Sequence, residues 1–240
     1  MADALLEQVR AFWDRQPCNV RHSPKPVGTR EYFDEVEARK YKVEPHIPGF
    51  AQFERWRGKR VLEIGCGIGT DTVNFARAGA LITAVDLSAA SLELCRTRLG
   101  IYGLQDRVRL RLADCEALSD FVPPERYDLV YSFGVLHHTP RPARAVRQIR
   151  LYMDGSSELR LMLYSAVSVK SLMVALGMRR REAQAGCPVA YMYTRRGLAG
   201  LLEGFRITSL KKAHIFPWRL KDYSAYRYRK TLPWSMVPGL

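Results

Sequence analysis

The stretch Val61-Leu-Glu-Ile-Gly-Cys-Gly-Ile-Gly-Thr70 decides the fold of this chain. Its apolar start predicts a strand, its three glycines predict a tight turn, and the apolar residues that follow at helical spacing predict a helix. Glycine suits such a turn because it accepts positive φ angles and lets another molecule approach the backbone. The free N–H groups at the start of the helix add polar donors. The stretch therefore predicts a strand, turn and helix unit with a ligand at the turn.

An acidic residue follows the next predicted strand. Residues 81–85 are apolar apart from Thr83, and Asp86 comes directly after them. A carboxylate at this end of a strand can accept both hydrogen bonds of a ribose diol, and ligands of open α/β sheets bind in the crevice at the carboxyl ends of the strands. The turn and Asp86 together predict a pocket for a nucleoside cofactor, against the simpler interpretation of a turn that only joins a strand to a helix.

The glycine spacing separates two cofactor classes. A dinucleotide fingerprint is G-x-G-x-x-G, but here the third glycine, Gly69, comes one place early and Thr70 takes its position. Glu63 lies two residues before the first glycine, where a carboxylate would repel a pyrophosphate and attract a cation. The sequence therefore favours a cationic cofactor over NAD.

The pattern E-x-G-x-G-x-G with an acid after the second strand resembles the class I S-adenosylmethionine-dependent methyltransferases, in particular the small-molecule, type 11-like members. The resemblance covers about residues 55–215. It implies a Rossmann-like α/β fold, a doubly wound and mostly parallel sheet of six or seven strands with helices on both faces. It also implies S-adenosylmethionine as cofactor and S-adenosylhomocysteine as product. The residues that it assigns to cofactor binding are Glu63, Gly65, Cys66, Gly67, Gly69, Thr70, Asp86, Leu87, Asp114, Cys115, Ser132 and Phe133.

Two adjacent histidines, His137 and His138, follow the predicted fourth strand. Methyl transfer from a sulfonium needs no acid for the leaving group, but a hydroxyl acceptor must lose its proton, and histidine suits that step. Both are the candidate catalytic bases, and a similar pair occurs in quinone-biosynthesis methyltransferases. The alternative is that one histidine packs against the cofactor while the other shapes the loop.

Segments outside the sheet are expected to hold the acceptor. Residues 1–54 predict an N-terminal helical lid, residues 55–240 the cofactor-binding domain, and residues 165–193 a substrate insert after the fifth strand. Aromatic, basic and imidazole side chains in or beside these segments are the candidate substrate contacts: Arg21, His22, Tyr32, Tyr41, His46, Tyr164, Tyr191 and His214.

Composition favours one catalytic domain, since 240 residues with 47% hydrophobic content can bury a sizeable core. No apolar run reaches membrane-spanning length and the N-terminus does not resemble a signal peptide, so we expect a cytoplasmic protein without a membrane span. The five cysteines include no C-x-x-C pair, which predicts free thiols and no metal site.

The formal net charge of +14 points toward anionic partners such as nucleic acid. Against this, the arginines of residues 141–150 lie opposite the apolar face of a predicted helix, as solvated residues do, and the fourth strand lacks the Asn/Asp-Pro-Pro-Tyr/Phe motif of exocyclic base-nitrogen methyltransferases. Nucleic acid is therefore the weaker alternative as a partner.

Residues 206–216 predict a sixth strand, and only residues 223–228 offer a short seventh. A missing seventh strand would leave a sheet edge that a homodimer partner could cover. The leading interpretation is methylation of a small-molecule acceptor, at oxygen, in a biosynthetic pathway. The alternatives are an RNA methyltransferase that uses the basic surface and a protein that binds S-adenosylmethionine without methylating.

Overall fold

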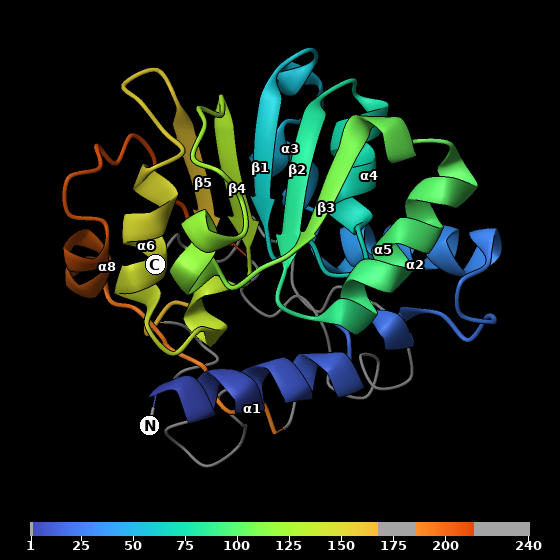
Figure 1. Ribbon diagram of the computed structural model, residues 1–240, viewed down its shortest axis with the longest axis horizontal. Helices are drawn as coiled ribbons and strands as arrows, with labels where there is room; N and C mark the ends of the chain where they lie inside the picture. The colour runs from blue at the N-terminus through green and yellow to red at the C-terminus, as the bar shows by residue number, and fades with distance from the viewer. Residues whose placement is uncertain (1, 168–185, 214–240) are drawn as a thin grey trace, which may run out of the picture.

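The computed structural model describes residues 2–167 and 186–213, which form an α/β fold around one sheet (Figure 1). The five strands are all parallel and run in the order β3-β2-β1-β4-β5. Their bounds are β1 Arg60–Ile64, β2 Leu81–Asp86, β3 Val108–Leu112, β4 Leu129–Phe133 and β5 Glu158–Met162. The order reverses between β1 and β4, and such a switch point opens a crevice at the carboxyl ends of the strands.

Helices cover both faces of the sheet because side chains alternate along each strand. Val61 packs into a core with α4 and α5, whereas Leu62 packs into a second core with α6 on the opposite face. The bounds of these three helices are α4 Thr70–Arg77, α5 Ala89–Tyr102 and α6 Pro142–Arg150. A further helix, α8, spans Arg195–Leu201. Short 3₁₀ turns at Gln105–Arg107, Cys115–Asp120 (η4) and Leu136–His138 connect them.

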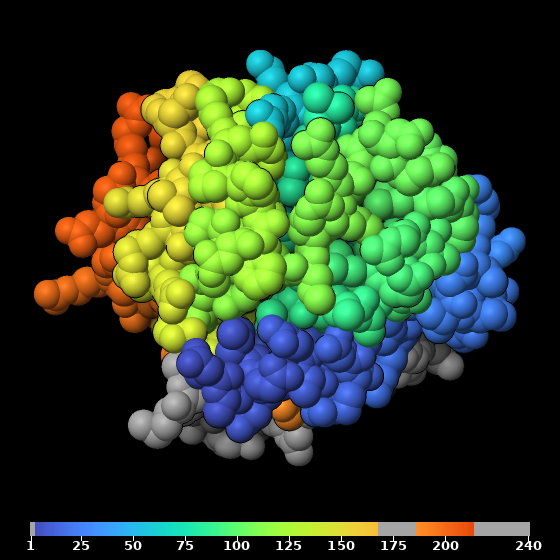
Figure 2. Space-filling view, viewed as in Figure 1, coloured from blue at the N-terminus to red at the C-terminus, as the bar shows by residue number. Residues whose placement is uncertain are grey.

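The N-terminal segment begins at the carboxyl ends of the strands and ends on the face of the sheet that α4 covers, where Ala51 and Trp56 join the core. Its elements are α1 Ala2–Arg15, η1 Val20–His22, α2 Arg30–Val43, α3 Ile47–Ala51 and η2 Phe53–Trp56. Figures 1 and 2 show α1, in blue, as a ridge across the side of the molecule below the sheet. Asp14 at its end accepts a hydrogen bond from Ser88 Oγ at 2.8 Å, just after β2. This contact places α1 over the crevice.

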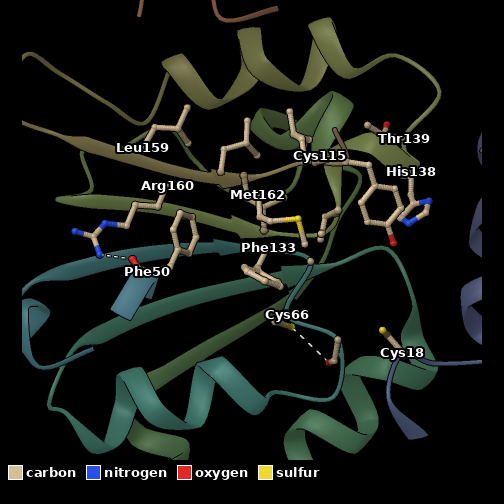
Figure 3. Close-up of a pocket in the computed structure, with 18 of the residues that line it drawn as sticks. Cys18, Phe50, Cys66, Cys115, Phe133, His138, Thr139, Leu159, Arg160 and Met162 are labelled. Carbon is tan, nitrogen blue, oxygen red and sulfur yellow. Dashed lines mark hydrogen bonds between the residues drawn. The ribbon is translucent and has the colours of Figure 1, made fainter. Parts of the chain in front are cut away.

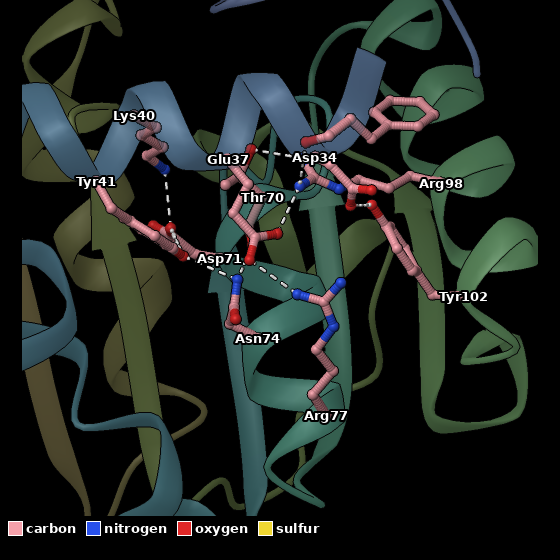
Figure 4. Close-up of polar contacts among 11 residues, drawn as sticks. Asp34, Glu37, Lys40, Tyr41, Thr70, Asp71, Asn74, Arg77, Arg98 and Tyr102 are labelled. Atoms are coloured by element: carbon pink, nitrogen blue, oxygen red, sulfur yellow. Dashed lines mark hydrogen bonds and ion pairs between the residues drawn. The ribbon is translucent and has the colours of Figure 1, made fainter. Parts of the chain in front are cut away.

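A buried polar network joins α2 to α4 and α5 (Figure 4). The guanidinium of Arg98, which is fully buried, donates to Thr70 Oγ1 at 2.7 Å and to Glu37 Oε2 at 2.8 Å. Asp71 Oδ1 lies 2.9 Å from Lys40 Nζ, and its Oδ2 accepts from Tyr131 at 2.9 Å. Since α4 begins at the glycine turn, α2 is attached to the element that carries the turn.

The sheet corrects one prediction, because the described residues contain five strands rather than six or seven. Residues 206–213, expected to start a sixth strand, form none. All of them are exposed, so they bury no apolar face that would hold a strand against β5. Residues 214–216 and the candidate seventh strand at 223–228 lie outside the described part of the chain.

The domain division at residue 54 stays a prediction, as does the role of residues 165–193. The described ends of that insert meet in a parallel bridge between Ser165 and Tyr193. Within residues 2–167 and 186–213, no helix combines the length and the apolar character that crossing a membrane requires.

Candidate active site

The glycine turn follows β1 directly and is held against β2. The Gly65 and Cys66 amides both donate to the Val85 carbonyl, at 2.8 and 3.1 Å. Gly65 has a φ of +76°, and a Cβ there would lie 2.2 Å from a methyl group of Val135. Gly67 also has a positive φ, but a Cβ there would meet nothing within 4 Å. The backbone at Gly67 therefore faces open space that a ligand can enter.

Asp86, at the end of β2, is fixed by this turn. Its Oδ2 accepts from the Gly67 amide at 2.7 Å and its Oδ1 accepts from the Ser88 amide at 2.9 Å. Burial raises the pKa of this carboxyl above its usual value, while the two backbone donors oppose the shift. A carboxylate offers about four lone-pair sites, so acceptor capacity remains for a diol.

A second acid follows β3. Asp114 precedes η4, and its Oδ1 accepts from the Glu116 amide at 2.8 Å. Burial raises its pKa above the usual range. Glu116 is fully buried and accepts from the Arg141 amide at 2.6 Å, which ties η4 to the start of α6. Asp114 comes two residues after the end of β3, so the turn into η4 holds it at the carboxyl edge of the sheet.

One cavity joins these elements at the carboxyl ends of the strands, and Figure 3 shows Cys66, Cys115, Phe133 and His138 on its walls. The residues predicted to bind the cofactor that line it are Gly65, Cys66, Gly67, Thr70, Asp86, Leu87, Asp114, Cys115 and Phe133. Three others predicted for this role do not line it: Glu63, Gly69 and Ser132.

Strand alternation explains the position of Glu63. Like Val61, its side chain lies on the face of the sheet that α4 covers, and its Oε2 accepts from Thr72 Oγ1 at 2.6 Å. Burial, with a smaller contribution from Asp71, raises the pKa of Glu63 to about 8. The acid lies beneath the turn, so the structure gives no direct contact with a ligand.

Gly69 and Ser132 lie in the packed interior, away from the cavity wall. Gly69 is the N-cap of α4 in a left-handed conformation, and a Cβ there would lie 2.5 Å from Cys95 Sγ. Ser132 is fully buried in β4, and among the described residues its Oγ has no hydrogen-bond partner. Both support the turn and the strand rather than the cavity wall.

The two histidines differ in position. His138 lines the cavity, and its Nδ1 lies 2.6 Å from the Val189 carbonyl, which can only accept a hydrogen bond. A neutral ring that donates from Nδ1 carries its lone pair on Nε2. His137 is fully buried behind it, with its ring centre 4.3 Å from that of His138 and 3.8 Å from that of Tyr164. Of the two histidines, only His138 lines the cavity.

Some of the predicted substrate contacts line the cavity and others do not. Those that line the cavity are Arg21, His22, His46 and Tyr164. Tyr32, Tyr41 and Tyr191 do not line it, and His214 lies outside the described residues. Each of the three tyrosines has a local bond: Tyr32 donates to the Val20 carbonyl, Tyr41 to Asp71 and Tyr191 to the Pro140 carbonyl.

Sequence reasoning missed several cavity residues, among them Trp13, Lys40 and Glu44. Trp13 of α1 lies edge-on to His138, with 5.4 Å between ring centres. Lys40 and Glu44 also line the cavity, and burial raises the pKa of Glu44 to about 7. The four-residue spacing of Lys40 and Glu44 is a helix-pair signal that could have found them. Among the described residues, no group of histidine, cysteine and acidic side chains could hold a metal ion.

Residues 62–154 match the protein family described as Methyltransferase domain. This part of the chain is therefore similar to a methyltransferase domain. Magnesium protoporphyrin IX methyltransferase from Synechocystis PCC 6803, a structure with bound S-adenosylhomocysteine, shares the fold with a TM-score of 0.55 at 17% identity. That likeness covers 82% of this chain and 86% of the other.

Curated relatives match the methyltransferase domain over a limited length. The ubiquinone biosynthesis O-methyltransferase of Bordetella bronchiseptica is 39% identical over 92 residues, which are 38% of this chain and 36% of that protein. An uncharacterized protein of Synechococcus sp. is 27% identical over 177 residues, 70% of this chain and 39% of that protein. The chain thus spans well under half the length of these relatives.

Proposed function

We propose that the chain transfers a methyl group from S-adenosylmethionine to an oxygen atom of a small-molecule acceptor in a biosynthetic pathway. The observation that carries the proposal is the bond between Gly67 and Asp86, which joins the open glycine turn to a buried acid within a cavity that His138 also lines. The matched relative of Bordetella bronchiseptica is named an O-methyltransferase and a structural neighbour holds S-adenosylhomocysteine, which supports the same assignment.

The residues present fit the cofactor. Asp86 would accept the two ribose hydroxyls, Asp114 would accept from the adenine amino group, and the open backbone at Gly67 leaves room between them. When bound, S-adenosylmethionine supplies a methyl group on a sulfonium, a good electrophile with a neutral leaving group. The protein then has to position the acceptor and exclude water.

His138 would accept the proton of the acceptor hydroxyl at Nε2. The Val189 carbonyl holds the ring in the Nδ1–H form and stabilises the imidazolium that results. Trp13 packs edge-on against the same ring and brings α1 over this end of the cavity. Orientation of the base therefore depends on the described end of the insert and on the N-terminal helix.

The test is a methyl-transfer assay with His138→Asn, whose amide can still donate near the position of Nδ1 but cannot act as the base. We expect the turnover number to fall by about 10² to 10⁴-fold, with the dissociation constant for S-adenosylhomocysteine nearly unchanged. His46→Asn, at another lining position, is the matched control. Full turnover by the His138 variant, or loss only in the His46 variant, would refute the assigned base.

The remaining partner expectations stay predictions. Salt-sensitive RNA binding in a gel shift at two ionic strengths would favour the RNA methyltransferase alternative. Tight cofactor binding without methyl product from any acceptor pool would favour a non-methylating protein. A homodimer and a cytoplasmic location are likewise open to measurement.

A further inference from the structure

Glu44 lies in the connection between α2 and α3, and its side chain lines the cavity. Its amide donates to the Lys40 carbonyl at 2.8 Å, and its carbonyl accepts from the Ile47 amide at 3.1 Å. Both bonds use backbone atoms only. The backbone at Glu44 is therefore held from both sides, while the carboxyl group faces the cavity.

The carboxyl group of Glu44 lacks a donor. No hydrogen bond or ion pair reaches it from the residues that the structure describes. The neighbouring cation is engaged elsewhere, because Lys40 Nζ pairs with Asp71 Oδ1 at 2.9 Å. Burial raises the pKa of Glu44 to about 7, with the charge of Lys40 opposing the shift. A buried carboxyl without a donor is destabilising, so a cavity ligand that donates a hydrogen bond to it binds more tightly.

Aromatic side chains from β4 and α3 form the cavity wall beside Glu44 (Figure 3). The ring centres of Phe133 and Phe50 are 5.9 Å apart, and that of His46 lies 5.8 Å from that of Phe133. Lys40 Nζ lies 5.7 Å from the centre of the Phe133 ring. Lys40 comes four residues before Glu44 and His46 two residues after it, so Glu44 belongs to the same part of the cavity.

The charges around Glu44 favour a neutral donor. The ammonium group of Lys40 would repel a ligand cation, and the carboxylates of Asp71 and Glu44 would repel an anion. A hydroxyl group donates a hydrogen bond without bringing another charge into the site. The flat faces of Phe133 and Phe50 suit an aromatic ring. A hydroxyl on an aromatic ring therefore matches both parts of this wall.

We propose that Glu44 accepts a hydrogen bond from a hydroxyl group of an aromatic acceptor whose ring packs against Phe133. The inference rests on the proposed function and deepens it, because it names a phenol as the class of acceptor. In this arrangement Glu44 is a specificity-determining residue that selects and orients the ring. Proton removal stays assigned to His138.

Titration of the protein with phenol and with fluorobenzene, followed by ligand-observed NMR with S-adenosylhomocysteine present, tests the proposal. The two compounds have nearly the same size, but fluorobenzene has no proton to donate. We expect phenol to bind about tenfold more tightly than fluorobenzene. Glu44→Ala should weaken phenol by about tenfold and leave fluorobenzene unchanged. Glu44→Gln, whose amide oxygen still accepts a hydrogen bond, should keep most of the affinity for phenol. Glu31→Ala, at an exposed position of the same helix, is the control and should bind phenol as wild type does.

Equal binding of phenol and fluorobenzene to wild type, or a phenol affinity that Glu44→Ala leaves unchanged, would overturn the proposal. Benzylamine separates a cation from a hydroxyl, and we expect it to bind more weakly than phenol. Tighter binding of benzylamine that is lost in both Glu44 variants would overturn the proposal in favour of a cation site. Failure of the proposed function looks different: S-adenosylhomocysteine does not bind, while Glu44→Ala still weakens phenol added alone.

Discussion

Asp86 and Glu63 show how strand geometry separates two acids that a motif places together. Asp86 ends β2 and reaches the cavity, where the Gly67 and Ser88 amides bind its two oxygens. Glu63 lies within β1, so alternation turns its side chain under α4 toward Thr72. The residue types and the spacing predicted the turn and the position of Asp86 at the end of β2. They could not tell which face of the strand Glu63 takes, because its neighbours on both sides are apolar.

Glu63 should make folding stability depend on pH. Its folded pKa is about 8 against a usual value of 4.5, so between these values the unfolded chain releases a proton that the folded chain keeps. Stability from this group is therefore present below pH 4.5 and is lost as pH rises toward 8. We expect Glu63→Gln to gain up to about 4 kcal/mol over wild type between pH 5 and 8.

Urea unfolding at pH 5, 6.5 and 8 measures this gain. Glu54→Gln is the control, since Glu54 is exposed and pairs with Arg57 on the surface. A difference between Glu63→Gln and wild type that stays constant over this range would contradict the burial of a protonated acid.

At the scale of elements, α2 owes its position to Arg98. This guanidinium, on α5, bonds Thr70 of α4 and the Phe33 carbonyl and Glu37 of α2. We expect Arg98→Met to lower the free energy of unfolding by about 2–3 kcal/mol, because buried acceptors lose their donor. Arg96→Gln, at an exposed pair with Glu93, should change it by less than about 0.5 kcal/mol. Equal unfolding midpoints in urea would disprove the structural role of the network.

Element boundaries were predictable where hydrophobic periodicity is strong. The strand before the glycine turn, the strand before Asp86 and the helix of residues 141–150 lie where the apolar pattern places them, as β1, β2 and α6. The network of Arg98 was not predictable, since a lone arginine on a helix gives no signal of burial. The prediction of a sixth strand was wrong for a different reason. A strand has to pair with the edge of the sheet, but residues 206–213 are exposed and form no strand.

At the scale of the whole molecule, the glycine turn with Glu63 and Asp86 predicted the α/β fold and a cavity at the end of β2. Another part of the cavity wall depends on side chains that meet only in three dimensions, such as Trp13 of α1 beside His138. Their positions follow from helix packing across long sequence separations. The fold could therefore be predicted from the sequence, whereas the contact between Trp13 and His138 could not.

Calorimetric titration of the folded protein with S-adenosylhomocysteine and, separately, with NAD tests the central claim most directly. We expect S-adenosylhomocysteine to bind at one site, NAD to give no comparable heat, and Asp86→Asn to weaken S-adenosylhomocysteine by at least about tenfold. A folded wild-type protein that ignores S-adenosylhomocysteine, or that binds NAD more tightly, would contradict the assignment of the glycine turn to a methyl donor.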